Sequence, residues 1–273
     1  MEHQTNEIKI LEFFCGIGGM HYAFNLSGKF GKVVAAFDIN IVANAVYKHN
    51  FNKEPIVKGI DSLSVEDIEK YNANCWFMSP PCQPYTRGGK FLDDKDPRSK
   101  ALLHLINILP KLSNSPKYIF LENVLNFEKS KCRDKLVSEL YKMNYEIHEC
   151  LLTPLQFGIP NDRLRYYLMA CKRNNEKNPA LNHIIEPRNY LENSIINTNW
   201  PFKCMILDNN EDEEEKRFKV PEKYILKSSN FRFDIVRPTD KKSSCFTKSY
   251  GSHNVFSSGS LIQTKNLEVK KSP

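Results

Sequence analysis

The first 172 residues alternate between short apolar runs and amphipathic stretches, and this alternation restricts the fold more than any other feature. The apolar runs are rich in Ile, Val, Phe and Tyr, and we expect them to form strands: Ile8–Phe14, Lys32–Asp38, Cys75–Ser79, Lys117–Glu122 and Leu164–Cys171. The stretches between them place apolar residues at helical spacing: Met20–Leu26, Ile41–His49, Val65–Tyr71, Ser99–Leu112 and Cys132–Met143. Such alternation predicts an α/β fold with a mostly parallel sheet and helices on both faces.

The pattern ends near residue 172. Residues 173–199 contain eight asparagines and several prolines without a sustained period, which is typical of an irregular surface segment. We therefore predict a first domain over residues 1–172 and a smaller, mixed lobe over residues 173–260. Residues 261–273 would begin a return to the first domain.

Composition excludes several classes of protein. The chain is 41% apolar and 26% charged, which argues against extensive disorder. No stretch has the roughly 18 consecutive apolar residues of a membrane helix, and the first ten residues lack the features of a secretory signal. Because no export signal is visible, we expect the eight cysteines to stay reduced, and none of them forms the C-x-x-C pair of a zinc or redox site, so we expect no metal site. These features predict a cytoplasmic protein without membrane contact, with the nucleus as a second possible location.

The C-terminal part of the chain is basic. Residues 216–273 carry 13 Lys and Arg against 4 Asp and Glu, a net charge of +9, and seven aromatic residues are interleaved with them. A basic surface with stacking rings suits nucleic acid, especially unpaired bases. A solvated lysine-rich face would have the same composition. Charge alone therefore leaves both interpretations open.

A glycine-rich turn follows the first predicted strand, in the sequence Phe14-Cys15-Gly16-Ile17-Gly18-Gly19. Glycine lets backbone approach a ligand closely, and the helix that follows favours anionic groups at its N-terminus. The second strand ends in Asp38, at a position where an acid commonly holds ribose hydroxyls. A nicotinamide dinucleotide is disfavoured because its G-x-G-x-x-G pattern would need glycine in place of His21. A plain strand–helix turn is the alternative.

The third predicted strand leads into Ser79-Pro80-Pro81-Cys82-Gln83-Pro84. The prolines end the strand and hold a single cysteine at its carboxyl edge. A thiol with a pKa near ~8.5 is the best side-chain nucleophile close to neutral pH. The segment therefore predicts a catalytic Cys82, and a buried structural cysteine is the alternative.

Two further motifs lie at strand ends. Glu122-Asn123-Val124 closes the fourth strand, where an acid facing the cleft could donate a proton. Arg163-Leu164-Arg165 precedes the last strand, and at period two its arginines share one face, from which they could hold a carbonyl oxygen. An ion-paired glutamate and surface charge are the respective alternatives.

In this order and spacing, the glycine turn, the Pro-Pro-Cys-Gln-Pro loop, Glu-Asn-Val and Arg-x-Arg resemble the cytosine-5 methyltransferases, over residues 8–172 and again near 236–264. Within that family, Cys245-Phe246-Thr247 followed by Lys248, Tyr250 and Gly251 resembles the tRNA-directed branch. Members of that branch methylate cytosine 38 in the anticodon loop of aspartate tRNA. Amino-group methyltransferases are disfavoured because they need no thiol at the position of Cys82.

The resemblance implies a Rossmann-like sheet that binds S-adenosylmethionine, a target-recognition lobe, a monomer and tRNA as partner. Cys82 would add to C6 of cytosine, Glu122 would contact N3, Arg165 would bind O2 and Arg163 would shape the same pocket. The cofactor would lie against Phe14, Gly16, Ile17, Gly18, Gly19, Asp38, Ile60, Asp61 and Ser79. The substrate would lie against Gln83, Asn123, Cys245, Phe246, Thr247, Lys248 and Tyr250.

One feature departs from the family pattern. The family ends in a Gly-Asn-Ser segment and a final helix, and no Gly-Asn-Ser occurs in this sequence. We therefore expect a chain truncated at its C-terminus, with weak or no activity as a hypothesis. The alternatives to a tRNA methyltransferase are a DNA cytosine-5 methyltransferase and a catalytically silent tRNA-binding form.

Overall fold

The computed structural model describes residues 7–85, 92–173, 220, 233–246 and 259–263. The chain divides into two compact units. The first comprises Met1–Leu151 and Arg165–Glu186, and the second comprises Leu152–Leu164 and Pro187–Pro273. Residues 152–164 thus group with the second unit, whereas the sequence pattern suggested a single boundary near residue 172.

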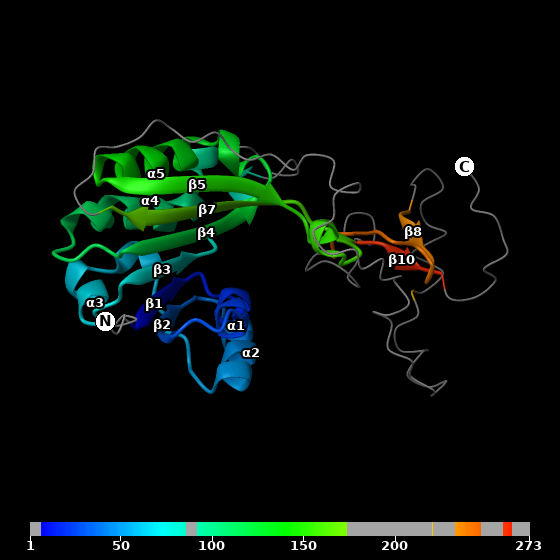
Figure 1. Cartoon of the computed structure of the whole chain (residues 1–273), viewed down its shortest axis with the longest axis horizontal. Coiled ribbons are helices and arrows are strands. Elements are labelled where there is room, and N and C mark those ends of the chain that lie inside the picture. The colour runs from blue at the N-terminus through cyan, green and yellow to red at the C-terminus, as the bar shows by residue number, and fades with distance from the viewer. Residues whose placement is uncertain (1–6, 86–91, 174–219, 221–232, 247–258, 264–273) are drawn as a thin grey trace, which may run out of the picture. The chain divides into compact units, whose positions relative to one another are not determined.

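The first unit is built on a six-stranded sheet (Figure 1). Its spatial order is β2 (Gly31–Phe37), β1 (Ile8–Phe13), β3 (Cys75–Met78), β4 (Tyr118–Val124), β7 (Arg165–Lys172) and β5 (Tyr145–Leu152). Strand β1 pairs in parallel with β2 and β3, and β3 pairs in parallel with β4. Strand β7 runs antiparallel to β4. The predicted α/β fold is confirmed, and the five predicted strands are present within two residues of their expected bounds.

Five α-helices accompany the strands among the described residues: α1 (Gly19–Leu26), α2 (Ile41–Phe51), α3 (Val65–Glu69), α4 (Lys100–Ile108) and α5 (Lys131–Lys142). Side-chain caps start three of them, because the oxygens of Asn40, Ser64 and Ser130 accept the backbone N–H groups that begin α2, α3 and α5. Helix α4 is shorter than predicted and gives way to a 3₁₀ turn that contains Pro110.

Helices cover both faces of the sheet, as alternation along β1 shows. Ile10 packs with Phe24 of α1 and Tyr47 of α2 in one apolar cluster. The ring of Phe13, which points to the opposite face, meets Trp76 edge-on at 5.1 Å between centroids. Trp76 in turn borders an apolar interior that it shares with residues of β3, β4, α4 and α5: Met78, Leu105, Ile106, Leu109, Ile119 and Leu136.

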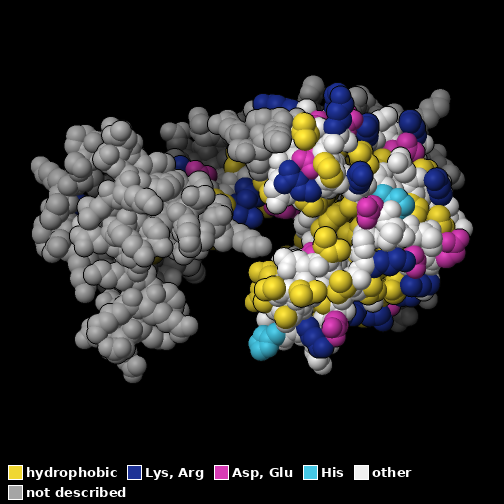
Figure 2. Space-filling view, turned by 180° about the vertical axis from the view of Figure 1, so that it is seen from behind, with side chains coloured by type: hydrophobic (Ala, Val, Ile, Leu, Met, Phe, Trp, Pro, Cys, Tyr) yellow, Lys and Arg dark blue, Asp and Glu magenta, His cyan; other side chains and the backbone are white. Residues whose placement is uncertain are grey.

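Helices α1 and α2 keep an apolar outer surface. Exposed side chains there are Tyr22, Leu26, Ile41, Val42 and Val46. Figure 2 shows hydrophobic side chains gathered at this end of the first unit.

No helix among the described residues has the length and apolar character needed to span a bilayer.

The second unit contains short strands in its described part. Strand β6 (Asn161–Asp162) pairs in parallel with β9 (Ser243–Ser244), and β8 (Ile235–Val236) pairs in parallel with β10 (Leu261–Ile262). The carboxylate of Asp234 accepts hydrogen bonds from the hydroxyls of Ser244 and Ser260 and so joins the two strand pairs.

Candidate active site

The carboxyl ends of the parallel strands lie at one edge of the sheet, where the sequence places its motifs. The backbone N–H of Cys15 donates to the carbonyl of Phe37 at 3.2 Å, and that of Ser79 donates to the carbonyl of Phe13 at 3.3 Å. The turns after β1 and β3 are therefore tied to neighbouring strand ends. Phe14, the first residue after β1, has a φ of 57°. This value is rare for a bulky residue, and such residues cluster at functional turns.

The glycine turn leaves its backbone open to a ligand. A Cβ atom at Gly16 or Gly19 would meet nothing within 4 Å, whereas one at Gly18 would lie 2.2 Å from the ring of Phe51. Gly18 has a φ of 89° and provides no side-chain cap to α1. The predicted cofactor turn thus has an accessible surface at Gly16 and Gly19, whereas its opposite side, at Gly18, is tightly packed against Phe51 and Tyr47.

Asp38 is joined to this turn, as its position at the end of β2 suggested. One carboxylate oxygen, Oδ2, accepts from the backbone N–H of Gly16 at 2.8 Å, and Oδ1 accepts from that of Asn40 at 2.8 Å. Ile39, which follows, is 71% exposed and was not singled out from the sequence. An exposed apolar side chain beside a fixed carboxylate is a suitable surface for a nucleoside.

The next two predicted cofactor residues differ from each other in exposure. Ile60 and Asp61 begin a 3₁₀ turn, in which the Ile60 side chain is buried and Asp61 is exposed. Only Asp61 of this pair can therefore offer its side chain to a ligand without rearrangement.

Cys82 is a free, half-buried cysteine in the loop after β3. Its carbonyl accepts the backbone N–H of Tyr85 at 3.0 Å, so a 3₁₀ turn over Gln83–Tyr85 follows it directly. Tyr85 is buried and meets the ring of Phe127 edge-on. These contacts hold the cysteine at the carboxyl edge, where the prolines predicted it.

Arg98 is a cation near Cys82 that sequence analysis missed. The hydrogen bond to Asp96 raises the pKa of Arg98, and electrostatic interactions with Asp96 and, to a smaller extent, with Cys82 add to this effect. Asp96 holds the guanidinium through two hydrogen bonds, at 2.9 Å to Nε and 2.7 Å to Nη2. The Asp-x-Arg spacing is the sequence signal for this bidentate pair.

Glu122 and Arg165 form an ion pair across β4 and β7, with 3.3 Å between Oε1 and Nε. Asn123 points away from this pair and is buried. Its amide donates to the carbonyl of Pro80 at 3.2 Å and its oxygen accepts from the backbone N–H of Val124. Asn123, predicted to contact substrate, thus tethers the Cys82 loop to β4.

In the second unit, Arg163 and Cys245 come together although 82 residues separate them. The Arg163 guanidinium donates to the Cys245 thiol at 2.9 Å. Phe246 is half-buried and its ring lies against Gly259. Arg163 and Arg165 therefore have different partners, one in each unit. The predicted substrate residues Thr247, Lys248 and Tyr250 lie outside the described residues.

The sequence matches the family described as C-5 cytosine-specific DNA methylase over residues 8–271. The chain belongs to this family. It is therefore a cytosine-C5 methyltransferase by descent, and its six-stranded sheet with helices is consistent with the α/β methyltransferase fold.

Individual relatives within the family carry two kinds of name. A DNA (cytosine-5)-methyltransferase of Dictyostelium discoideum is 40% identical, over 95% of this chain and 77% of its own length. A tRNA (cytosine(38)-C(5))-methyltransferase of Spodoptera frugiperda is 42% identical, over 96% of this chain and 76% of its own. The crystal structure of the S. pombe Dnmt2 methyltransferase superposes with a TM-score of 0.80 at 32% identity, covering 96% of this chain and 78% of that one.

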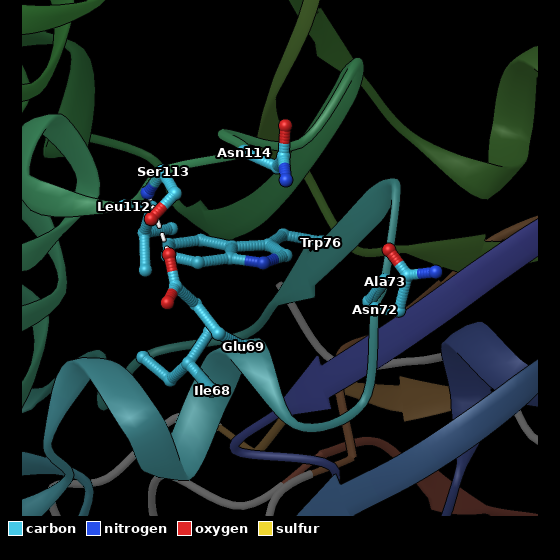
Figure 3. Close-up of a pocket in the computed structure, with 8 residues that line it drawn as sticks. All are labelled: Ile68, Glu69, Asn72, Ala73, Trp76, Leu112, Ser113 and Asn114. Carbon is cyan, nitrogen blue, oxygen red and sulfur yellow. Dashed lines mark hydrogen bonds between the residues drawn. The ribbon is translucent and has the colours of Figure 1, made fainter.

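A hollow lies elsewhere on this methyltransferase (Figure 3). It measures about 220 Å³ and lies before the start of β3, at the opposite end of that strand from Cys82. The Glu69 carboxylate crosses it to accept the backbone N–H of Ser113 at 2.5 Å. Within the described residues no cluster of His, Cys, Asp or Glu could hold a metal ion. The candidate active site is therefore the edge that carries Cys82, Glu122 and Arg165.

Proposed function

We propose that this chain transfers a methyl group from S-adenosylmethionine to C5 of a cytosine in tRNA, namely cytosine 38 in the anticodon loop of aspartate tRNA. The observation that carries the proposal is the arrangement at the sheet edge. A half-buried thiol is held after β3, and a carboxylate–guanidinium pair follows on the neighbouring strands. These are the groups that an attack on cytosine C6 requires.

The residues at the glycine turn fit the proposed cofactor. The open surface at Gly16 and Gly19, at a helix N-terminus whose N-cap residue is glycine, suits the anionic end of an amino acid. The Asp38 carboxylate retains acceptor capacity for ribose hydroxyls beyond its two backbone hydrogen bonds. Exposed Ile17 and Ile39 offer apolar surface to an adenine ring. S-adenosylmethionine, when bound, supplies an electrophilic methyl group.

Phe14, Gly18, Ile60, Asp61 and Ser79 complete the proposed cofactor set. Phe14 and Gly18 shape the turn through their positive φ values. Ser79 joins the end of β3 to the end of β1. Ile60 would support the cofactor site by packing in the interior, and Asp61 would offer its exposed side chain to the cofactor.

The chemistry of this chain's own residues follows from the reactivity of cytosine. The Cys82 thiolate forms a bond to C6, and the electron pair of the C5–C6 double bond moves toward N3. In its protonated form, Glu122 donates a proton or hydrogen bond to N3 and so stabilises that charge. Arg165 orients Glu122 and binds O2. C5 becomes nucleophilic as a result. After methylation, loss of the C5 proton lets the thiolate leave and restores the aromatic ring.

The proposed substrate is RNA because an anticodon loop presents its bases unpaired, so little energy is needed to bring cytosine to Cys82. Several relatives are named for tRNA cytosine 38, among them those of Spodoptera frugiperda and Homo sapiens. We assign tRNA recognition to residues 173–260, through Cys245, Phe246, Thr247, Lys248 and Tyr250. Arg163, which donates to Cys245, would shape the cytosine pocket, and Gln83 would lie beside the nucleophile. We further propose a monomer that acts in the cytoplasm.

DNA is the second candidate substrate, because one relative at 40% identity is named a DNA methyltransferase. The experiment measures transfer of labelled methyl from S-adenosylmethionine to total tRNA and to duplex DNA in parallel. We expect label in tRNA at cytosine 38, and none from the Cys82→Ala variant. Label in DNA alone would overturn the tRNA proposal, and no label in either from a folded chain would indicate a silent binding form.

Cys171→Ala is the matched control for Cys82→Ala. Cys171 is also free and half-buried, but it pairs with Tyr118 at the start of β4, the end of that strand farthest from Val124. Its loss should leave methyl transfer within about twofold, since the two sites are distant and independent. An equal loss in both variants would mean that Cys82 has no special role.

A further inference from the structure

A buried carboxylate lies directly below the glycine turn and has no part in the chemistry described above. Glu12, in β1, is 2% exposed and points to the same face as Ile10, toward α1 and α2. Burying a carboxylate is costly unless donors satisfy it. The Tyr47 hydroxyl donates to its Oε2 at 2.9 Å, and the backbone N–H of His21 donates to the same carboxylate.

The network continues from Tyr47 to the side chain of His21. Nδ1 of His21 lies 2.7 Å from the Tyr47 hydroxyl oxygen, and its ring stacks on Phe51 with 4.0 Å between centroids. Phe51 and Tyr47 are also the side chains that a Cβ atom at Gly18 would strike, at 2.2 and 2.9 Å. The three polar groups and Phe51 therefore form the floor of the glycine turn.

Helix α1 depends on this floor because it has no cap of its own. Its N-cap residue, Gly18, lacks a side chain and so makes no cap hydrogen bond. His21 is the third residue of the helix, and its N–H is one that an N-cap side chain normally accepts. Glu12 takes that role from the adjacent strand, while the upper surface at Gly16 and Gly19 stays uncovered.

Within this network, Glu12 is the group that changes its ionisation near neutral pH. Burial raises the pKa of Glu12 to about 7, against the lowering effect of its hydrogen bonds. Burial, with a smaller contribution from Lys53, lowers the pKa of His21 to about 4. Cys15 and Tyr47 also face Glu12. Burial, and to a smaller extent the charge of Glu12, raises the pKa of the Cys15 thiol and of the Tyr47 hydroxyl. Asp38 faces Cys15 and acts on the pKa of its thiol in the same direction. His21 therefore stays neutral where Glu12 titrates.

The state of Glu12 fixes the tautomer of His21. The Tyr47 hydroxyl has a single proton. When Glu12 is ionised, Tyr47 donates to it and His21 must donate from Nδ1. When Glu12 is protonated, it can donate to Tyr47, which then donates to His21 Nδ1 and leaves the ring proton on Nε2. The two arrangements differ in the direction of both hydrogen bonds that the Tyr47 hydroxyl makes.

We propose that Glu12, Tyr47 and His21 are positioning residues that hold the glycine turn and the first turn of α1 in the shape that binds S-adenosylmethionine. They act through the turn and do not touch the cofactor. The inference rests on the proposed function, because it concerns the affinity of the same site. It predicts that removal of the Tyr47 hydroxyl weakens cofactor binding, although Tyr47 is 0% exposed and cannot touch the cofactor.

The first unit contains a matched network for the control. Tyr166 donates to the buried carboxylate of Glu149, which also accepts from Arg133 Nε at 2.7 Å. This second tyrosine–glutamate pair joins β7 to β5 and α5, none of which contributes to the glycine turn. Tyr47→Phe and Tyr166→Phe thus each remove one buried hydroxyl from a carboxylate in the same unit.

The experiment measures the affinity of the full chain for S-adenosylmethionine by calorimetry. Tyr47→Phe should weaken binding about tenfold and Tyr166→Phe by less than about twofold, because only the first hydroxyl supports the turn. His21→Phe, which keeps the ring on Phe51 but loses Nδ1, should weaken it several-fold. In turnover, the KM for the cofactor should rise while kcat at saturation stays unchanged.

Two outcomes separate this inference from the function on which it rests. A wild-type chain that binds no S-adenosylmethionine overturns both. A wild-type chain that binds it, with Tyr47→Phe binding equally well, overturns this inference alone.

Nitrogen-15 shifts of His21 give an independent readout. They should report Nε2–H below about pH 7 and Nδ1–H above it, and one tautomer throughout would contradict the network.

Discussion

Arg165 Nε lies 3.3 Å from Glu122 Oε1, with the two side chains 16% and 26% exposed. The register explains the pairing, since Arg165 is opposite Val124 and Glu122 is two residues earlier on the same face of β4. The partly buried ion pair fixes the carboxylate before any substrate arrives. The group that we propose to contact N3 of cytosine is thereby held at the sheet edge that carries the Cys82 loop.

Glu122→Gln should lower kcat for methyl transfer by about 10²-fold, the usual contribution of a positioned acid. The amide keeps the shape of the carboxylate but cannot donate a carboxylic proton. Cofactor affinity should stay unchanged, which calorimetry checks. Full activity in this variant would remove Glu122 from the mechanism.

Arg165→Lys should not preserve activity, because a lysine cannot reproduce the planar guanidinium that meets both the carboxylate and a carbonyl oxygen. We expect a loss of at least about tenfold in kcat/KM for tRNA. The measurement is steady-state methyl transfer at varied tRNA. A lysine variant as active as the wild type would indicate that charge alone suffices.

Arg98→Gln should slow alkylation of Cys82 by iodoacetamide at neutral pH several-fold, because the substitution removes the electrostatic interaction between the guanidinium and Cys82. Peptide mass spectrometry gives the rate at Cys82 relative to that at Cys171, the half-buried thiol remote from Arg98. If that ratio does not change, the electrostatic interaction between Arg98 and Cys82 has no chemical consequence.

Glu12→Gln should change the pH dependence of stability. The pKa of Glu12 is raised from 4.5 to about 7, so the folded chain keeps a proton that the unfolded chain loses, and wild-type stability falls as pH rises between these values. His21, with its pKa lowered from 6.5 to about 4, gives the opposite slope between pH 4 and 6.5.

The variant retains only the His21 effect, so its stability should rise with pH over this range. Relative to the variant, the wild type should lose on the order of 2 kcal/mol between pH 5 and 7. Urea unfolding at the two pH values provides the comparison. Parallel pH profiles for the two proteins would show that Glu12 does not titrate in this range.

Gly18→Ala should destabilise the chain more than Gly16→Ala. Both glycines have positive φ, so both variants bear backbone strain of about 1 kcal/mol. Only at Gly18 would the new methyl also lie 2.2 Å from the Phe51 ring, which adds about 1–3 kcal/mol of overpacking. Chemical denaturation of both variants tests the difference, and equal losses would contradict the tight floor.

Much of the first unit could be predicted from local pattern, because each parallel strand is a short apolar run. Strand β5 was missed. Its sequence contains Glu146, His148 and Glu149, and Glu149 is buried only because Arg133 and Tyr166 reach it from other elements. The antiparallel direction of β7 was missed as well, because composition carries no information on direction.

The site shows the same limit. Asp38 and Cys82 could be located because strand ends of a parallel sheet share one edge. The contact between Arg163 and Cys245, and the burial of Ile60 and Asn123, depend on packing between distant segments. Arg98 follows a short polar segment whose tertiary neighbours the sequence does not reveal.

The bond from the Asn123 amide to the Pro80 carbonyl has a mechanical consequence. Asn123 adjoins Glu122 in sequence, and Pro80 lies two residues before Cys82, so the bond couples the strand of the acid to the loop of the nucleophile. Thermal bending of the sheet would then displace both groups together. The separation of Glu122 and Cys82, on which the proposed simultaneous contact with one pyrimidine ring depends, would change less than the position of either residue.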